Sequence, residues 1–154
     1  GPNSPMICVP MSEQMTPILC VGESKGEREA GEARAVVETQ LATALRGVRL
    51  HGNARLLIAY EPVWAIGAGE SASVGDVIEM HRFIRSILAN LFPDAPAGQM
   101  AILYGGSVDG ENAYRFLRES EVDGVLVGGA SVKINQFKEI VEAAAEVLEA
   151  QRPE

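Results

Sequence analysis

The sequence predicts an α/β fold in which four parallel strands alternate with helices. Four short apolar runs span residues 17–21, 56–59, 100–103 and 124–127, and runs of this kind are typical of strands buried on both faces. Each run is followed by a short turn and then by a segment with helical periodicity. This alternation indicates a parallel sheet with right-handed crossovers. The chain has 154 residues, 47% of them apolar, which is enough for one domain with a sizeable core.

The segments that follow the runs predict four helices. Glu29–Leu45 and Val74–Phe92 repeat apolar residues at spacings of three or four, as the buried face of an amphipathic helix does. Asn112–Leu117 predicts a short helix, and Ile134–Leu148 predicts a longer closing helix. The apolar positions that indicate the two long helices are Ala33, Val36, Val37, Leu41 and Leu45, then Val77, Ile78, Phe83, Ile84, Ile87 and Leu88.

The ends of the chain and its cysteines bear on domain organisation and compartment. Residues 1–5 resemble the remnant of a cleaved expression tag, residues 6–15 have no assigned element, and the βα units occupy residues 16–150. No secretory signal follows residue 5. Cys8 and Cys20 match neither a metal-ligand pattern nor a disulfide framework, and Cys20 is expected to be a small buried thiol. These features favour the cytoplasm.

The charge and hydropathy of the chain exclude several classes of partner. A formal charge of −8 argues against a nucleic-acid-binding protein, because binding phosphate backbones requires clustered Lys and Arg. No apolar run reaches the roughly 18 to 20 residues that span a bilayer. We therefore expect no nucleic acid and no membrane as partners. We also expect no metal and no cofactor. A small phosphorylated ligand remains possible, because backbone N–H groups can bind phosphate without net positive charge.

The stretch Tyr60–Gly69 carries a candidate catalytic carboxylate. Glu61 follows the second apolar run, at the strand end where parallel α/β folds place catalytic groups. Beyond Pro62 an apolar segment ends in two glycines, as in a lid with a flexible tip. Closure of such a lid would exclude water and make the carboxylate a stronger base. An ordinary strand-end glutamate followed by a surface loop fits the same spacing.

Two glycine pairs predict a phosphate site. Gly105-Gly106-Ser107 follows the third run, and Gly128-Gly129-Ala130-Ser131 follows the fourth. Glycine lets the backbone approach an anion closely, and successive N–H groups supply positive potential. Tight turns alone explain a single glycine pair. Two pairs at consecutive strand ends favour convergence on one phosphate.

Taken together, residues 16–148 resemble the second half of the triosephosphate isomerase family. The segments that carry the resemblance, in the family's order, are Thr16–Glu23, Glu27–Gly31, Ala59–Gly67, Tyr104–Val108 and Asp123–Ser131. The run Glu-Pro-Val-Trp-Ala-Ile-Gly is highly specific. The resemblance implies half of a TIM (β/α)8 barrel and the parent reaction of glycolysis and gluconeogenesis, which interconverts glyceraldehyde 3-phosphate and dihydroxyacetone phosphate.

The resemblance also implies residue roles. Glu61 matches the general base. Backbone N–H groups at Gly67, Ser107, Gly128 and Gly129 match the phosphate grip, whereas Glu23 and Arg28 match structural residues near the lid. The lid comprises Pro62, Val63, Trp64, Ala65, Ile66, Gly67, Ala68, Gly69, Glu70, Ser71 and Ala72.

The chain departs from the family pattern in three places. The second lid hinge reads Glu70-Ser71-Ala72 where the family has Lys-Thr-Ala. The family's Asn-x-Lys, whose lysine neutralises the substrate, and its Ser-His-x-x-Arg-Arg, whose histidine polarises the carbonyl, have no counterpart. The two histidines, His51 in a loop and His81 in a helix, are expected to be solvated surface residues.

These departures predict that the chain alone has no appreciable isomerase activity, because a base without its electrophile catalyses enolisation poorly. The first interpretation is a fragment whose function belongs to a parent enzyme. The second is a non-catalytic module that binds phosphorylated metabolites or self-associates. The third is one subunit of a split isomerase.

Burial predicts association. A closed eight-stranded barrel takes about 250 residues, so four units leave one apolar sheet face uncovered, with Ile18, Leu57, Ile102 and Leu126 among its candidates. The strands at both edges would also lack partners. We expect a homodimer through the open face, or a complementary N-terminal half, to cover it.

Overall fold

The computed structural model describes residues 15–66, 72–96 and 98–153. Along this part of the chain the elements are β1 (Ile18–Val21), α1 (Lys25–Glu29), α2 (Ala33–Ala44), β2 (Leu56–Tyr60), the 3-10 turn η1 (Val63–Ala65), α3 (Val74–Leu91), β3 (Met100–Tyr104), α4 (Ala113–Leu117), β4 (Gly124–Val125), the 3-10 turn η2 (Gly129–Val132) and α5 (Ile134–Ala150). None of the helices in these ranges is long and apolar enough to cross a membrane.

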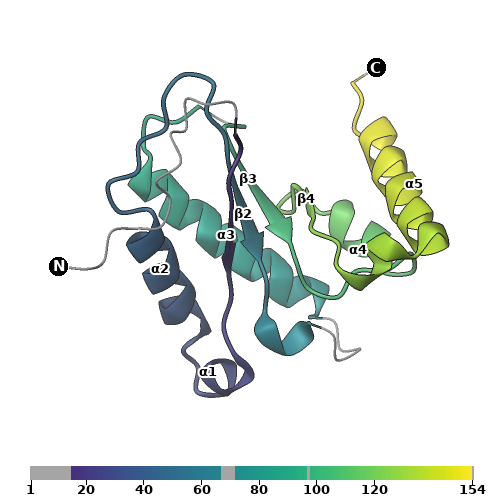
Figure 1. Cartoon of the computed structure of the whole chain (residues 1–154), viewed down its shortest axis with the longest axis horizontal. Coiled ribbons are helices and arrows are strands. Elements are labelled where there is room, and N and C mark those ends of the chain that lie inside the picture. The colour runs from purple at the N-terminus through teal and green to yellow at the C-terminus, as the bar shows by residue number, and fades with distance from the viewer. Residues whose placement is uncertain (1–14, 67–71, 97, 154) are drawn as a thin grey trace.

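The strands form a parallel sheet in which each strand pairs with the next along the chain. Ile18 lies opposite Leu57, Leu57 opposite Ala101, and Leu103 opposite Gly124. The order within the described residues is β1-β2-β3-β4, and in Figure 1 α3 passes behind the sheet while α2 lies to its left. The predicted fold class is confirmed: the structure is an open part of a TIM barrel, with four parallel strands alternating with helices in the ranges described.

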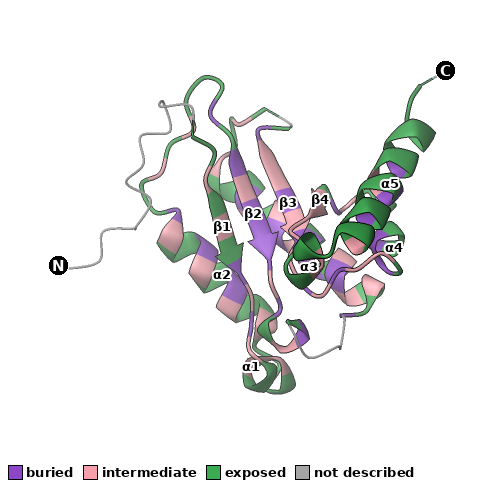
Figure 2. Ribbon diagram, turned by 45° about the vertical axis from the view of Figure 1, so that its right-hand side comes forward, coloured by how far each residue is buried: buried purple, intermediate pink, exposed green. Residues whose placement is uncertain are grey.

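One face of the sheet forms the core with the crossover helices. Alternate residues of the central strands point toward α2 and α3, because side chains along a strand alternate between faces. The buried residues on this side are Leu56, Ile58, Tyr60, Ile102 and Tyr104 of the sheet, Val37 and Leu41 of α2, and Val77, Ile84 and Leu88 of α3. Figure 2 shows this burial along β2.

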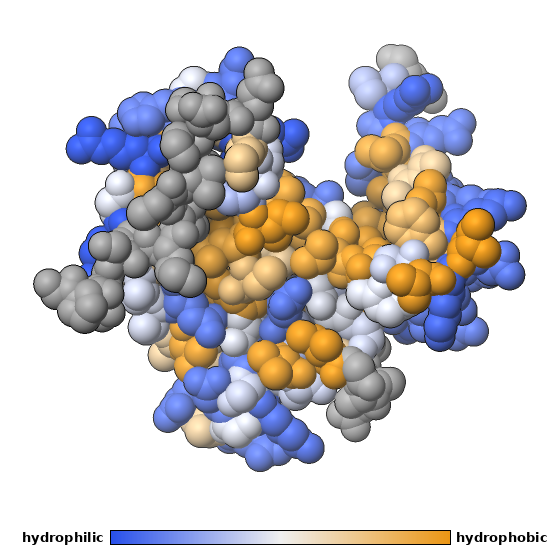
Figure 3. All heavy atoms as spheres, in the orientation of Figure 1, coloured by the Kyte–Doolittle hydropathy of each residue, from blue (hydrophilic) through white to orange (hydrophobic). Residues whose placement is uncertain are grey.

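The other face of the sheet is open. Ile18 is 46% exposed and Cys20 is exposed, whereas Leu57, Ala101 and Leu103 are half-buried. Figure 3 shows an apolar patch over this side of the molecule. The expectation of strands buried on both faces is therefore wrong for β1, because no described element covers its second face. The expectation that Cys20 is buried is wrong for the same reason.

The sequence predicts Ile102 on the open face of the sheet, but this residue lies on the helix-covered face. It pairs with Ile58, whereas Leu57 pairs with Ala101, and its side chain is fully buried. A shift of one residue in register exchanges the two faces of a strand. The apolar run 100–103 has no polar alternation that would have revealed which residues face inward.

The first expected helix, Glu29–Leu45, begins later in the structure, at Ala33 of α2, and a separate short helix that was not predicted, α1, precedes it. Gly31 adopts a φ of 75° between α1 and α2, in the left-handed region that glycine enters without strain. α1 begins with a capping box, in which the Ser24 hydroxyl accepts the Glu27 N–H and the Glu27 carboxylate accepts the Ser24 N–H. The other three helices match their expected ranges to within two residues at each end.

The expectation that His81 is a solvated surface residue is also wrong, because it is buried on the inward face of α3. It lies four residues after Val77 and three before Ile84, so it belongs to the apolar stripe of the helix. Its Nδ1 lies 3.1 Å from the carbonyl oxygen of Glu121. Burial lowers the pKa of His81 to about 4, against a smaller raising effect of that hydrogen bond. His51, by contrast, is exposed in a loop as expected.

Candidate active site

Glu61 follows β2 directly and lies across the end of β3. Its N–H donates to the carbonyl oxygen of Val21 at 2.7 Å, which continues the pairing with β1 past the last strand residue. A Cβ atom placed on Gly105 would lie 2.6 Å from Cγ of Glu61, and one on Gly22 would lie 1.8 Å from the Glu61 carbonyl oxygen. Glycine at both positions is therefore what makes room for Glu61 at this strand end.

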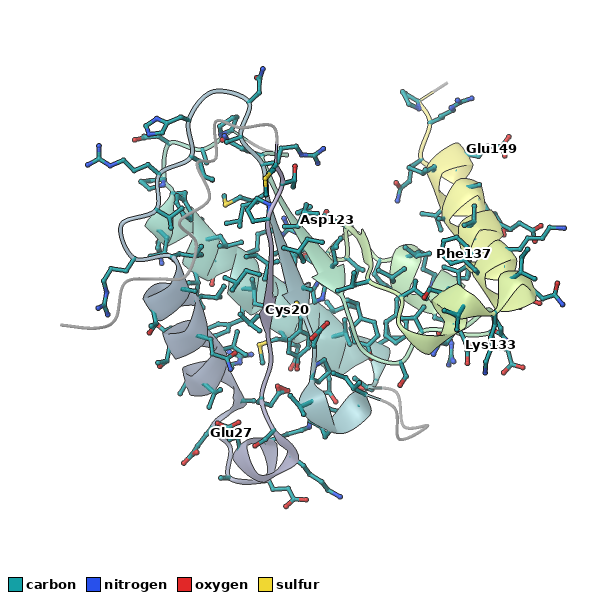
Figure 4. The ribbon with its side chains drawn as sticks, in the orientation of Figure 1. Cys20, Glu27, Asp123, Lys133, Phe137 and Glu149 are labelled. Carbon is teal, nitrogen blue, oxygen red and sulfur yellow. The ribbon has the colours of Figure 1, made fainter. Side chains whose placement is uncertain are left out.

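Cys20 lies beside the Glu61 carboxylate on the open face of the sheet. Partial burial raises the pKa of the Cys20 thiol, and the charge of Glu61 and a hydrogen bond to it raise it further. Figure 4 labels Cys20 on β1. The sequence pattern does not predict Cys20 as a site residue. Its register opposite Ala59, two residues before Glu61, is what places it there.

A buried cluster holds the first hinge of the lid. The carboxylate of Glu23 is fully buried and accepts hydrogen bonds from Tyr60 Oη at 2.5 Å and from Trp64 Nε1 at 3.4 Å. The backbone carbonyl of Glu23 accepts the N–H of Val63 at 3.0 Å. Burial, followed by the hydrogen bond to Glu23, raises the pKa of Tyr60, which keeps its hydroxyl a donor. Glu23 therefore binds the hinge through both side chain and backbone.

Arg28 extends the same cluster to α3. Its guanidinium lies 4.6 Å from the ring centroid of Trp64, and NH1 lies 3.9 Å from Oε1 of Glu23. NH2 lies 2.6 Å from Oδ2 of Asp76, in the first turn of α3. The Arg28 side chain therefore links α1, η1 and the helix that follows the lid. A structural role for Glu23 and Arg28 is what the resemblance implies.

Ser107 connects the loop after β3 to the lid. Its N–H donates to the carbonyl oxygen of Ala65 at 3.2 Å, and its hydroxyl donates to the same oxygen at 2.6 Å. In this conformation the Ser107 N–H is therefore already paired with Ala65 of the lid. Asn112 holds Ser107 from the other side, because its Nδ2 donates to the Ser107 carbonyl at 3.0 Å.

The two glycine pairs line one cavity of about 350 Å³ at this edge of the sheet. The loop after β3 supplies residues 105–109, and the segment after β4 supplies residues 128–130. Ile66 of the lid, with Lys133 and Gln136 at the start of α5, completes the lining. Gln136 ties the two sides together, because its Oε1 accepts the N–H of Gly110 at 2.9 Å. The cavity volume lies in the range of small-ligand sites.

The structure thus brings most of the expected site residues to one edge. Ser107, Gly128 and Gly129 line the cavity, and Gly105, which also lines it, contacts Glu61. Of the lid, Pro62–Ile66 and Ala72 are described, whereas residues 67–71, including the expected phosphate ligand Gly67 and the altered hinge residues Glu70 and Ser71, lie outside the described residues. In the described ranges no three His, Cys, Asp or Glu side chains gather as metal ligands.

Comparison with known proteins decides the family. The family model for triosephosphate isomerase matches residues 7–144. The chain belongs to the triosephosphate isomerase family. The match begins inside residues 6–15, where the sequence predicts no element. Those residues lie outside the described part of the chain up to residue 14.

Individual triosephosphate isomerases align over most of the chain but only part of their own length. The enzyme of Aquifex aeolicus is 50% identical over 125 residues, which are 81% of this chain and 50% of that protein. The enzyme of Roseiflexus sp. is 47% identical over 131 residues, 85% of this chain and 52% of that protein. The enzyme of Protochlamydia amoebophila is 44% identical over 127 residues, 82% and 48% respectively. The chain therefore spans about half the length of the curated relatives it matches.

Proposed function

We propose that this chain supplies the catalytic base and the phosphate cradle of the triosephosphate isomerase reaction. The observation that carries the proposal is the position of Gly105. Gly105 contacts the Glu61 side chain and also lines the cavity with Gly128 and Gly129. A triose phosphate is short, so its phosphate and its reacting carbons must be bound at adjacent places. Gly105 makes the two places adjacent.

In this proposal Glu61 removes a proton from the carbon next to the carbonyl of the triose and returns it to the neighbouring carbon. The backbone N–H groups of Gly67, Ser107, Gly128 and Gly129 hold the phosphate. The Ser107 N–H must leave the carbonyl oxygen of Ala65 to do so. Phosphate binding and movement of Ala65 in the lid are then coupled through one hydrogen bond, which is a direct route for closing the lid on substrate.

We further propose that the 154-residue chain alone does not catalyse the reaction. An enolate needs preorganised positive groups at the developing charge, and losing them costs several orders of magnitude in rate. His81 is buried in the core on α3 and His51 is exposed in the loop before β2. Neither histidine therefore lies at the strand end that carries Glu61, where a group that polarises the carbonyl would be needed.

A coupled assay with glyceraldehyde 3-phosphate tests both statements. The purified chain is expected to show no turnover above the Glu61→Gln variant. Addition of a separately produced first half of a triosephosphate isomerase is expected to restore turnover to the unmodified chain and not to the Glu61→Gln chain. Near-normal turnover by the pure chain would refute its inactivity. Equal restoration of the variant would refute the role of Glu61.

The open sheet face supports a second proposal, that the chain pairs through this face with a copy of itself or with a complementary half. Ile18 is 46% exposed there, and large exposed apolar patches mark association surfaces. Sedimentation equilibrium is expected to give a dimer for the unmodified chain. Ile18→Lys is expected to give a monomer, whereas Leu91→Lys, a matched change at an exposed apolar residue on α3, should leave the dimer intact. A stable unmodified monomer at micromolar concentration would contradict self-association.

A further inference from the structure

The cavity has two charged side chains in its lining, Asp109 and Lys133, and they differ in what they bind. Asp109 Oδ1 accepts the N–H groups of Glu111 and Asn112, both at 2.9 Å. The Asp109 carboxylate therefore already binds the backbone of its own turn. Lys133 is exposed, and no ion pair within 4.0 Å involves it among the described residues. The positive charge of Lys133 is therefore available to the cavity.

Lys133 occupies a position that helix physics disfavours. It is the N-cap of α5, it makes no side-chain capping hydrogen bond, and the first turn of α5 contains no acidic residue. The N-terminal end of a helix carries partial positive charge, so a cation there is repelled and Ser, Thr, Asp or Asn is preferred. A residue that is unfavourable for its own helix is expected beside a ligand cavity when that residue binds the ligand.

We propose that Lys133 is the side-chain cation of the phosphate cradle, and that it selects a dianionic phosphate over neutral or singly charged groups. The glycine loops supply only partial charges from N–H dipoles. Lys133 adds a full positive charge on the α5 side of the same cavity, and Figure 4 labels it at the N-terminal end of α5. A bound dianion would also offset the repulsion between Lys133 and the helix end. This inference rests on the proposed phosphate cradle.

Titration of the full 154-residue chain with inorganic phosphate tests the proposal, with the backbone amide resonances of Gly128 and Gly129 as the readout. Lys133→Ala is expected to weaken binding by about three- to fivefold, the upper part of the scale for one exposed ion pair. Lys133→Arg keeps the charge and should stay within about twofold of the unmodified chain. The matched control is Lys138→Ala, on the same helix but outside the cavity, where Lys138 Nζ lies 3.8 Å from Glu142.

Thermal unfolding without phosphate separates a ligand role from a structural one. Removing the cation from the helix end should leave the Tm of Lys133→Ala unchanged or raise it by about 1 to 3 °C. Affinity then falls while stability does not. A residue that merely maintains the loop would lower both, and that result would overturn the proposal.

The outcomes distinguish this inference from the function on which it rests. If phosphate leaves the Gly128 and Gly129 resonances of the unmodified chain unchanged, the cradle itself fails and Lys133 with it. If phosphate shifts them and Lys133→Ala binds as tightly as Lys138→Ala, the cradle stands and the role of Lys133 is refuted.

Discussion

The helices α3 and α5 both carry repeating apolar residues, but the structure covers these residues to different extents. Both are long, with 18 and 17 residues, and both are amphipathic. On α3 the inward side chain of Ile84 is fully buried, because the helix packs against β3 and beside α2. On α5 Ile134 is 83% exposed and Leu148 is 67% exposed. Apolar periodicity thus predicts that a helix forms, and not that its apolar residues are covered.

The difference arises because α5 has two apolar stripes and α4 covers one of them. Ile140, Ala143 and Val147 are buried, on the side where α5 contacts α4. A second stripe, with members three, four or seven residues apart, is exposed in the described structure and consists of Ile134, Phe137, Val141 and Leu148. An apolar sector this wide is typical of a helix with two neighbours. Figure 2 shows α5 projecting from the rest of the molecule.

The sharpest test of this comparison makes the same substitution in both helices. Ile84→Ala in α3 is expected to lower the free energy of unfolding by about 2 to 5 kcal/mol, because it removes a fully buried side chain and leaves a cavity. Ile134→Ala in α5 is expected to change it by less than about 0.5 kcal/mol, because the side chain is exposed. Urea unfolding followed by circular dichroism measures both.

The comparison breaks if the two variants lose equal stability. That result would mean that the exposed stripe of α5 is covered in solution. Repeating the measurement over a range of protein concentrations would then show whether a second copy covers it, since stability of a dimer rises with concentration.

The next test concerns the buried histidine of α3. The pKa of His81 is about 4 in the folded chain and about 6.5 when unfolded. Because the unfolded state binds the proton first, stability is fully present above pH 6.5 and falls as the pH drops toward 4. We expect a loss of about 2 kcal/mol between pH 7 and pH 5. Urea unfolding at several pH values measures it.

Histidine variants provide the controls for this pH dependence. His81→Gln should flatten the slope between pH 7 and pH 5, because glutamine has no proton to gain. His51→Gln should leave it unchanged, because His51 is exposed. An unchanged slope in His81→Gln would show that other groups cause the pH dependence.

The smallest expected effect compares two tyrosine hydroxyls. Tyr60→Phe removes the donor that lies 2.5 Å from the buried Glu23 carboxylate and should cost about 1 to 2 kcal/mol of unfolding free energy. Tyr114→Phe, on α4 near α5, removes an exposed hydroxyl and should cost less than about 0.5 kcal/mol. If Tyr60→Phe proves as neutral as Tyr114→Phe, Glu23 is satisfied by water or by its other partners, and the lid hinge does not depend on Tyr60.

The part of the candidate site that directly follows the strands could be predicted from the sequence. Glu61 and the two glycine pairs follow strands, so parallel pairing alone brings them to one edge. Cys20 and Lys133 were missed as site residues for different reasons. Cys20 reaches Glu61 through the register between β1 and β2, and Lys133 reaches the cavity only because α5 begins beside it. Neither relation is a spacing within the sequence.

The sequence by itself determined the order of strands and helices and the positions of the glycines that allow Glu61 and the loops to approach. These are local properties, set by apolar periodicity and by the absence of a Cβ atom. Only the tertiary structure decided that His81 is buried, that Ile102 faces the helices and that α5 keeps an uncovered stripe. Burial depends on which neighbour occupies the space beside a residue, and that neighbour is supplied by a distant part of the chain or lies outside it.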